Sequence, residues 1–486
     1  MIECELIVPP SDSDLEKYKR VSVSFSDYTR FEDPNSTARQ EAKKRFMTAE
    51  DYVPQYSYPK LTSLWDGDEV RQSKTILYEA ALELEVGRRA AELLNDEYRT
   101  SELELYRAFN DLRLQRVMLV EAAHALGASR TSSAVETAKE TFNELNAELY
   151  GEVNSSWYLG MMESEREKIE GFSPTNEDAR KLVGELKEIF SNIERTNTVE
   201  PAIMDERALA TFNKVLLDRY QEVLSAVPNT GDDVRYDANQ CAEIMNKALV
   251  AGGLYDQGWR AVVDPSKSNP STRGGTSRIS LPSNTSRTAQ ELRRLILHEQ
   301  EVHARRGQNA RDLGSDVLFT GTADYVDVEE GLGVLFECVL EGNFDNPSFQ
   351  RARERYITIG LALGVNGTPR DARETFEVLW RILALNDSKN GEVDEKIIKS
   401  ARDRAYRHIE NAYRGTNFAM KGVVFRKMKV YYEGLKKNAD YFSSHQENIN
   451  NTLDVVMMGK YNHVDPRESH VVTVLVSHLN TDIRQS

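Results

Sequence analysis

The sequence has few cysteines, no long apolar run and a shortage of positive charge, and each of these excludes a class of protein. Its three cysteines, Cys4, Cys241 and Cys338, lie far apart, so they indicate neither a disulfide framework nor a paired-cysteine zinc knuckle. The first twenty residues lack a basic stretch followed by an apolar one, and no segment approaches the ~18 uncharged apolar residues of a membrane span. We therefore expect a soluble cytoplasmic protein that is neither secreted nor membrane-bound.

Acidic residues outnumber basic residues by 78 to 62, which gives a formal net charge of −16. Binding to a nucleic-acid backbone depends on clustered lysine and arginine, so this charge disfavours a nucleic-acid partner. At 486 residues the chain is long enough for about two to four domains. The composition gives no indication of an oligomeric state.

Most of the chain has the apolar spacing of helices. Residues 1–70 lack sustained periodicity, so we expect an extended arm with one short helix around "STARQEAKKRF". In residues 71–228 apolar positions recur every three or four residues, and turn-forming stretches interrupt the pattern. This pattern predicts an antiparallel helical array rather than a single coiled coil.

Two short segments, "GWRAVV" and "SRISLP", favour strands and flank the turn-rich stretch "DPSKSNPSTRGGT". We expect them to pair with each other. Helical patterns then continue through "RARERYITIGLALG", "TPRDARETFEVLWRILAL" and later segments. The predicted fold class is therefore mainly α (α+β), a helical body with one small β-sheet.

The segment "SNTSRTAQELRRLILHEQEVHARRGQNA" predicts a helix that begins at a capping box formed by Thr288 and Glu291. This helix carries His298, Glu299 and His303. Residues five apart are separated by ~140° on a regular α-helix, so the two histidines can share a metal only if the helix contains a π-type turn or breaks. Otherwise they are separate side chains, partly buried or solvated.

A third ligand could come from "DVEEGLGVLF", which predicts a helix with Glu329 and Glu330 among Leu, Val and Phe. A carboxylate on such a face needs a partner, and a metal ion would be one.

Four ordered motifs then resemble a known family. "HEQEVH" at 298–303, "EEGLG" at 329–333, "RGT" at 414–416 and "FRKMKVYYEG" at 425–434 are similar to motifs of the microtubule-associated tyrosine carboxypeptidases and their bacterial relatives named after a QEGLA motif. The resemblance covers about residues 235–435. It implies a Zn²⁺ cofactor bound by His298, His303 and Glu330, with Glu299 as general base.

The same resemblance gives roles to three further residues. Tyr431 would donate a hydrogen bond to the developing oxyanion, and Arg414 and Lys427 would bind the terminal carboxylate of a substrate. Each also has a purely structural interpretation: a packing tyrosine, a turn at the RGT sequence and a solvated lysine.

Three positions depart from the family pattern: Glu301, Ala310 and Gly333 stand where a small residue, Gly and Ala are usual. None of these changes removes a ligand. The carboxylate of Glu301 could raise the pKa of bound water, bind a second cation or point to solvent, and the solvated arrangement is the commonest. If Glu330 is not the third ligand, Glu329 and Glu301 are the next candidates.

These features favour a zinc metallocarboxypeptidase that removes a C-terminal residue, tyrosine being one candidate, from a protein or peptide. Residues 229–440 would form the catalytic domain, with the two strands bordering the metal cleft, and residues 441–486 would pack on it. A chain this acidic, with no obvious basic arm, does not favour tubulin as the substrate. The alternatives are a non-catalytic helical binding or regulatory protein with structural zinc, and a metal-dependent hydrolase of a non-peptide amide or ester.

Overall fold

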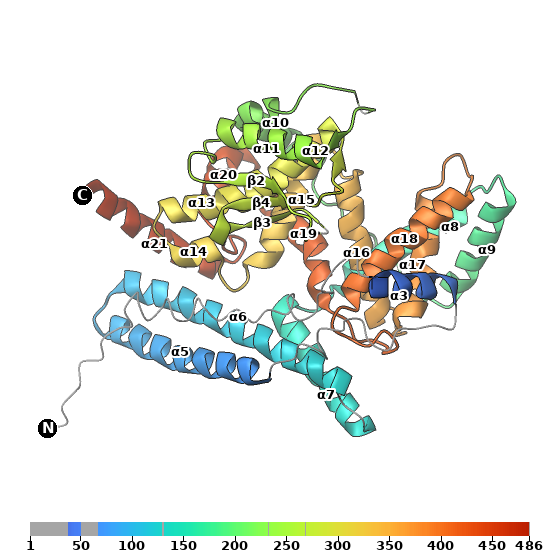
Figure 1. The fold of residues 1–486 in the computed structure, drawn as a ribbon, viewed down its shortest axis with the longest axis horizontal. Helices are drawn as coiled ribbons and strands as arrows, with labels where there is room; N and C mark the ends of the chain where they lie inside the picture. Colours follow the sequence, from blue (N-terminus) through green and yellow to red (C-terminus); the bar gives the residue numbers. More distant parts are fainter. Residues whose placement is uncertain (1–36, 50–66, 129–130, 232, 268, 486) are drawn as a thin grey trace.

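The computed structural model describes residues 37–49, 67–128, 131–231, 233–267 and 269–485, and most of the arm expected over residues 1–70 lies outside these ranges. The expected short helix is present as α3 (Thr37–Thr48). Helices dominate the fold and the strands form only small sheets, which confirms the mainly α class (Figure 1). In the described ranges, no helix has the length and apolar content needed to cross a bilayer.

The N-terminal helices form a layer along one side of the molecule (Figure 1). They are α5 (Gly67–Leu93), α6 (Glu97–Ala128) and α7 (Ser132–Tyr150). Helices α5 and α6 pack together, and α6 packs on α7. Their shared apolar core also contains Val423 and Phe425 from the C-terminal third of the chain. This layer is therefore attached to the segment that precedes Lys427.

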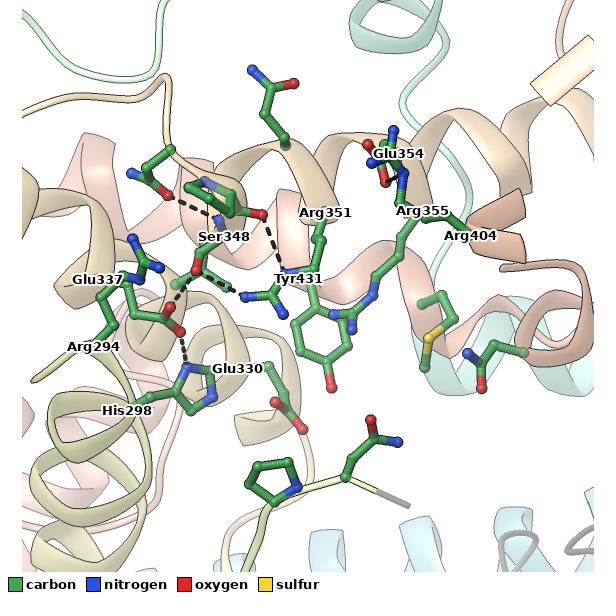
Figure 2. A pocket seen from close by; sticks show the side chains of 18 of the residues that line it. Arg294, His298, Glu330, Glu337, Ser348, Arg351, Glu354, Arg355, Arg404 and Tyr431 are labelled. Carbon is green, nitrogen blue, oxygen red and sulfur yellow. Dashed lines mark hydrogen bonds and ion pairs between the residues drawn. The ribbon is translucent and has the colours of Figure 1, made fainter. Parts of the chain in front are cut away.

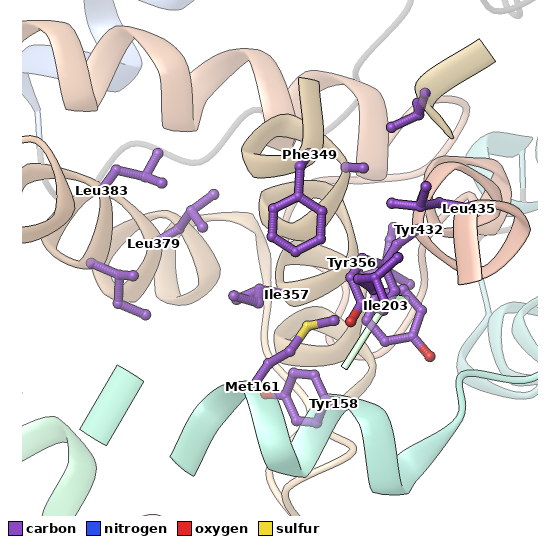
Figure 3. Close-up of a cluster of buried hydrophobic side chains, with 14 of the residues drawn as sticks. Tyr158, Met161, Ile203, Phe349, Tyr356, Ile357, Leu379, Leu383, Tyr432 and Leu435 are labelled. Atoms are coloured by element: carbon purple, nitrogen blue, oxygen red, sulfur yellow. The ribbon is translucent and has the colours of Figure 1, made fainter. Parts of the chain in front are cut away.

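The largest hydrophobic core joins helices from both halves of the chain (Figure 3). It includes Tyr158 and Met161 as well as Tyr356, Leu379 and Tyr432. The contributing helices include α8 (Ser155–Gly171), α9 (Glu177–Ser191), α10 (Glu206–Ser225), α16 (Pro347–Leu363), α17 (Ala372–Asn386), α18 (Glu395–Ala412) and α19 (Val430–Ser444). This core spans the boundary expected at residue 228, and the division into domains stays a prediction.

The small sheet has three strands in the order β2–β4–β3, of which sequence reasoning found two. The expected pair is present: β2 (Arg260–Val263) runs parallel to β4 (Arg278–Leu281). The third strand, β3 (Ser271–Arg273), pairs antiparallel with β4 and arises within the stretch expected to be a loop. A separate two-stranded ladder joins β1 (Tyr236–Asp237) to β5 (Ser286–Arg287).

One continuous helical segment crosses the body beside the sheet. Its first part is α12 (Ala289–Leu295), which begins at the predicted capping box of Thr288 and Glu291. It continues as the π-helix η2 (Ile296–Ala304) and ends as α13 (Arg305–Asp312). Neighbouring elements are α11 (Ala238–Ala251), the 3₁₀ turn η1 (Gly274–Thr276), α14 (Asp316–Thr320) and α15 (Tyr325–Glu341).

Helices α15 and α19 make an unusually close contact at two glycines. A Cβ atom at Gly331 would lie 2.0 Å from the backbone of Gly434, and one at Gly434 would lie 1.8 Å from the carbonyl oxygen of Asp327. Because real Cβ atoms do not approach other atoms this closely, only glycine fits at either position. The glycines of "EEGLG" and "FRKMKVYYEG" therefore serve helix packing.

The C-terminal elements complete the body. They are the 3₁₀ turns η3 (Arg426–Lys429) and η4 (Gln446–Asn448), α20 (Ile449–Val456) and α21 (Pro466–Gln485). Helix α21 contacts α6, and Tyr461, Val472 and Leu475 share an apolar cluster with Leu105 of α6. The C-terminal segment therefore packs partly on the N-terminal layer.

Candidate metal centre

His298 and His303 lie on the π-helix η2, which confirms the π-type turn predicted from their spacing. In a π-helix each amide bonds five residues back, so residues five apart return to the same face. The two imidazole ring centroids are 4.9 Å apart. The distortion of the helix therefore turns both histidines toward one point.

Glu330, on α15, completes a group of three. One ligand atom from each of His298, His303 and Glu330 lies within 4.8 Å of the other two. Figure 2 shows the Glu330 carboxylate beside the His298 ring. Two imidazoles and one carboxylate are a donor set that suits zinc, because it leaves a coordination position free.

Each histidine is held by a carboxylate at its other ring nitrogen. Glu337 Oε1 lies 2.6 Å from Nδ1 of His298 (Figure 2), and Glu329 Oε1 lies 2.9 Å from Nδ1 of His303. This arrangement leaves Nε2 of each ring as the atom available to a metal, and such second carboxylates fix the tautomer and orientation of ligating histidines. Sequence reasoning missed both roles. The available signal was that Glu329, Glu330 and Glu337 share one helix.

These contacts shift the protonation equilibria of the site. Burial would lower the pKa of His298, but the hydrogen bond and charge of Glu337, with the charges of Glu299 and Glu330, raise it to about 9. Burial would raise the pKa of Glu337, but the hydrogen bond and charge of His298 lower it to about 2. Glu337 is therefore an anion at neutral pH, and without a metal His298 is an imidazolium. Metal binding would release its Nε2 proton, while Glu337 retains the proton on Nδ1.

Glu329 forms an ion pair with Arg306, whose side chain is fully buried. Arg306 also donates to the carbonyl oxygens of Val456 (3.1 Å) and Tyr461 (3.0 Å). Burial would raise the pKa of Glu329, but the charges of Arg306 and Lys460 and its contact with His303 lower it to about 2. The C-terminal segment thus supports the orientation of His303.

The expected general base, Glu299, is held by the third strand. Its side chain lines the same cavity as the three candidate ligands. Thr272 of β3 places its hydroxyl 2.6 Å from Glu299 Oε2 and 3.0 Å from the Glu299 carbonyl oxygen. Because Thr272 fell in a predicted loop, sequence reasoning did not find this contact.

The expectation that the Glu301 side chain points to solvent was wrong. It is 0% exposed and faces away from the candidate ligands, toward α11. Arg305 approaches both of its oxygens, at 3.2 and 3.3 Å, and Gln300 donates to Oε1 at 2.8 Å. The charge of Glu301 is therefore compensated by Arg305. The second departure, Ala310, is simply buried.

Gly333 lies directly against the His298 ring. A Cβ atom there would be 2.6 Å from Cε1, 2.7 Å from Nδ1 and 2.8 Å from Nε2. The imidazole thus occupies the space that an alanine side chain would fill, and this departure from the family motif affects the seating of a candidate ligand.

These groups open into a polar cavity of about 1850 Å³. Tyr431, Arg414 and Lys427, to which the family resemblance gave roles, also line it, and those roles stay predictions. The guanidinium carbon of Arg355 lies 4.0 Å from the centroid of the Tyr431 ring. The Tyr431 hydroxyl points toward the end of the cavity where Glu330 lies (Figure 2). Burial and the charge of Glu330 raise the pKa of Tyr431 well above its usual value. Tyr431 therefore stays protonated at neutral pH and can donate.

The strand that borders this cavity is β3, not β2 or β4 as expected. Of the sheet, Ser271 and Thr272 of β3 line the cavity, whereas neither β2 nor β4 does. The prediction that "GWRAVV" and "SRISLP" form the bordering edge was wrong. The reason is that β4 is the central strand of the sheet, and β3, which pairs with it, supplies the edge that lines the cavity.

The fold and site together define a mainly helical protein with a two-histidine, one-carboxylate centre inside a polar cleft. Residues 196–387 match the family model described as microtubule-associated tyrosine carboxypeptidase. This match confirms the resemblance over those residues and indicates a carboxypeptidase-like hydrolase. It includes His298, Glu299, His303 and Glu330, and it ends before Arg414, Lys427 and Tyr431. No curated protein and no solved structure matches the chain.

Proposed function

We propose that the protein is a zinc-dependent carboxypeptidase that hydrolyses the last peptide bond of a protein or peptide. The observation that carries the proposal is the orientation of both imidazoles: carboxylates occupy Nδ1 of His298 and His303, which leaves Nε2 of each ring available next to Glu330. A structural zinc site has no need for a base, yet Glu299 opens into the same cavity.

The residues present fit a zinc ion. His298, His303 and Glu330 would hold it, and Glu337 and Glu329 would keep the two rings in the required tautomer. Because Gly333 has no side chain, the His298 ring can occupy the space beside α15. When bound, zinc supplies Lewis acidity, which polarises a carbonyl group and lowers the pKa of water.

The chain's own residues supply the proton transfers and the binding contacts. Glu299 accepts a proton from the attacking water and passes it to the leaving amine, while the Thr272 hydroxyl fixes the position of its carboxylate. Tyr431 donates its hydroxyl hydrogen to the substrate oxygen on which negative charge develops. Arg414 binds the terminal carboxylate, and the positive charge of Lys427, which also acts on Glu330, attracts it.

The substrate class that we propose is broader than the one in the family name. That name describes an enzyme that acts on tyrosine and associates with microtubules, and a tubulin tail peptide is one substrate to test. The net charge of −16 opposes long-range attraction to an acidic tail. A cytoplasmic location remains our expectation from the three separated cysteines.

The test pairs two variants with zinc analysis and mass spectrometry of a peptide library with varied termini. Glu299→Gln keeps the size of the side chain and all three candidate ligands, so zinc content should stay at the wild-type level while hydrolysis falls about 10²-fold or more. Glu330→Ala deletes a ligand and should weaken zinc retention. Unchanged turnover in Glu299→Gln would overturn the mechanism. Hydrolysis of amides or esters without peptide cleavage would favour the non-peptide alternative.

A further inference from the structure

The N-terminal helices contribute to the wall of the catalytic cavity. Arg116 of α6 and Tyr150, the last residue of α7, line it together with the candidate ligands. Both residues lie outside the matched segment 196–387. A helical layer that sequence reasoning treated as a separate region therefore reaches the candidate active site.

This contribution is built into the packing. Asn146 Oδ1 of α7 accepts from the backbone N–H of Arg426 at 3.0 Å, and Asn143 donates to the Gly422 carbonyl oxygen at 3.3 Å. The Tyr150 ring meets the Phe425 ring edge-on at a centroid distance of 5.4 Å. The N-terminal layer and the segment leading to Lys427 thus form one wall.

Three cations converge at this wall. Burial lowers the pKa of Lys427, nearby Glu330 opposes the shift, and the charges of Arg116 and Arg414 lower it further. The charges of the same two arginines also act on the Tyr150 hydroxyl. Arg116, Arg414, Lys427 and Tyr150 all line the cavity, and the charges of both arginines reach Lys427 and Tyr150.

Within the described residues, Arg116 and Arg414 differ from most buried arginines of this protein in having no acidic partner. In the part of the chain that the structure describes, no carboxylate forms an ion pair with Arg116 or Arg414. Nη2 of Arg414 donates a long hydrogen bond of 3.4 Å to Oδ1 of Asn411, and its Nε is buried without a hydrogen-bond partner among the described groups. Lys427, in contrast, faces Glu330. Two guanidinium groups are thus left for an anion that enters from outside.

We propose that Arg116 and Arg414 together bind the α-carboxylate of the substrate, so that the N-terminal helical layer closes the cleft beyond the scissile bond and makes the protein an exopeptidase. The inference rests on the proposed carboxypeptidase activity and adds its specificity for a free terminus. Planar guanidinium groups suit a carboxylate because they donate two parallel hydrogen bonds. A chain that continued past this position would place a neutral amide against two unpaired cations.

The test compares one peptide as its free acid and as its C-terminal amide. Arg116→Gln should lower kcat/KM for the free acid by about 10- to 100-fold, mainly through KM, and change the amide less than about twofold, because a charged hydrogen bond is lost only with the acid. Arg113→Gln is the matched control: it lies about one turn earlier on α6 and does not line the cavity. It should alter neither substrate. Arg116→Lys should recover part of the loss.

Binding gives a second readout that does not need turnover. In a Glu299→Gln background, calorimetry should show weaker binding of the free acid after Arg116→Gln and no change for the amide. Each variant is compared with itself on two ligands, so a partly unfolded preparation lowers both signals equally and does not imitate the expected result.

The outcomes separate the two claims. Equal losses for acid and amide, or no loss for either, would overturn the role of Arg116 while leaving peptide hydrolysis in place. Selective binding of the free acid through Arg116 without cleavage of any peptide would support the carboxylate site and overturn the proposed function.

Discussion

His298 and Glu337 are joined by a contact of 2.6 Å between Nδ1 and Oε1, although 39 residues separate them in the sequence. The same carboxylate accepts a hydrogen bond from Ser348, which in turn accepts one from Arg351 at 3.1 Å (Figure 2). The orientation of one candidate ligand is therefore set by a chain of polar contacts across α15 and α16.

Replacing Glu337 with glutamine should weaken zinc binding by about 10- to 100-fold, because the imidazole loses the anion that fixes its tautomer and increases its basicity. Competition with a chromophoric chelator measures the change. Glu341→Gln is the control: Glu341 lies one turn further along α15 and pairs with Arg294 rather than with a histidine. Equal zinc affinities for wild type and Glu337→Gln would show that this contact does not position the ligand.

Gly333→Ala should displace the His298 ring, since the new Cβ would approach three ring atoms at 2.6–2.8 Å. We expect a loss of about 1–3 kcal/mol in the free energy of unfolding, as for other overpacked sites, and weaker zinc binding. Urea titration and chelator competition measure the two effects. Gly184→Ala provides the comparison, because nothing lies near its Cβ position on α9; it should leave zinc affinity unchanged. Undiminished zinc affinity in Gly333→Ala would contradict this account.

Arg305→Ala should destabilise the fold without removing zinc. The change leaves the Glu301 carboxylate buried without its cation, and loss of one partner of such a pair typically costs about 3–5 kcal/mol. The double variant Glu301→Gln/Arg305→Met should recover much of this loss, as judged by urea unfolding. Because Glu301 faces α11, zinc stoichiometry should remain at the wild-type level in both variants. Loss of zinc in Arg305→Ala would reassign Glu301 to the metal site.

Glu468 should make stability depend on pH near neutrality. Burial and the charges of Asp324 and Asp465 raise its pKa from 4.5 to about 7, although it accepts from the backbone N–H of Asn462. The folded state thus favours the protonated form, and this contribution is complete below pH 4.5 and lost as the pH rises through about 7. Thermal unfolding at pH 5.5 and pH 8 should show a larger decrease in the wild type than in Glu468→Gln. Equal decreases would rule out this residue as the cause.

The sequence predicted features that depend on local spacing. The π-helix followed from His298 and His303, because a shared metal requires the five-residue interval to return to one face. The capping box of Thr288 and Glu291 likewise involves neighbours in the chain. In both cases the decisive contact lies within a few residues.

Features that depend on distant contacts were missed. Glu337 becomes a histidine partner only after α15 packs on η2, and Thr272 reaches Glu299 only after β3 joins the sheet. Arg116 had no local signal, since one arginine on a charged helix resembles any other. Glu301 was expected to be solvated because that is the commonest arrangement for a charged side chain, and the sequence did not show that this face of the helix packs on α11.

The glycine contact between α15 and α19 has a consequence for protein engineering. The close approach of the two helices that carry Glu330 and Tyr431 requires the missing side chains at Gly331 and Gly434. The hydrogen bond from Asn438 to the Val328 carbonyl oxygen holds the same two helices together. A methyl group added at either position would collide with the facing backbone, so the two helices could not keep their present contact. A substitution at either position would therefore disturb the distance between a candidate ligand and a candidate proton donor while leaving both residues chemically intact.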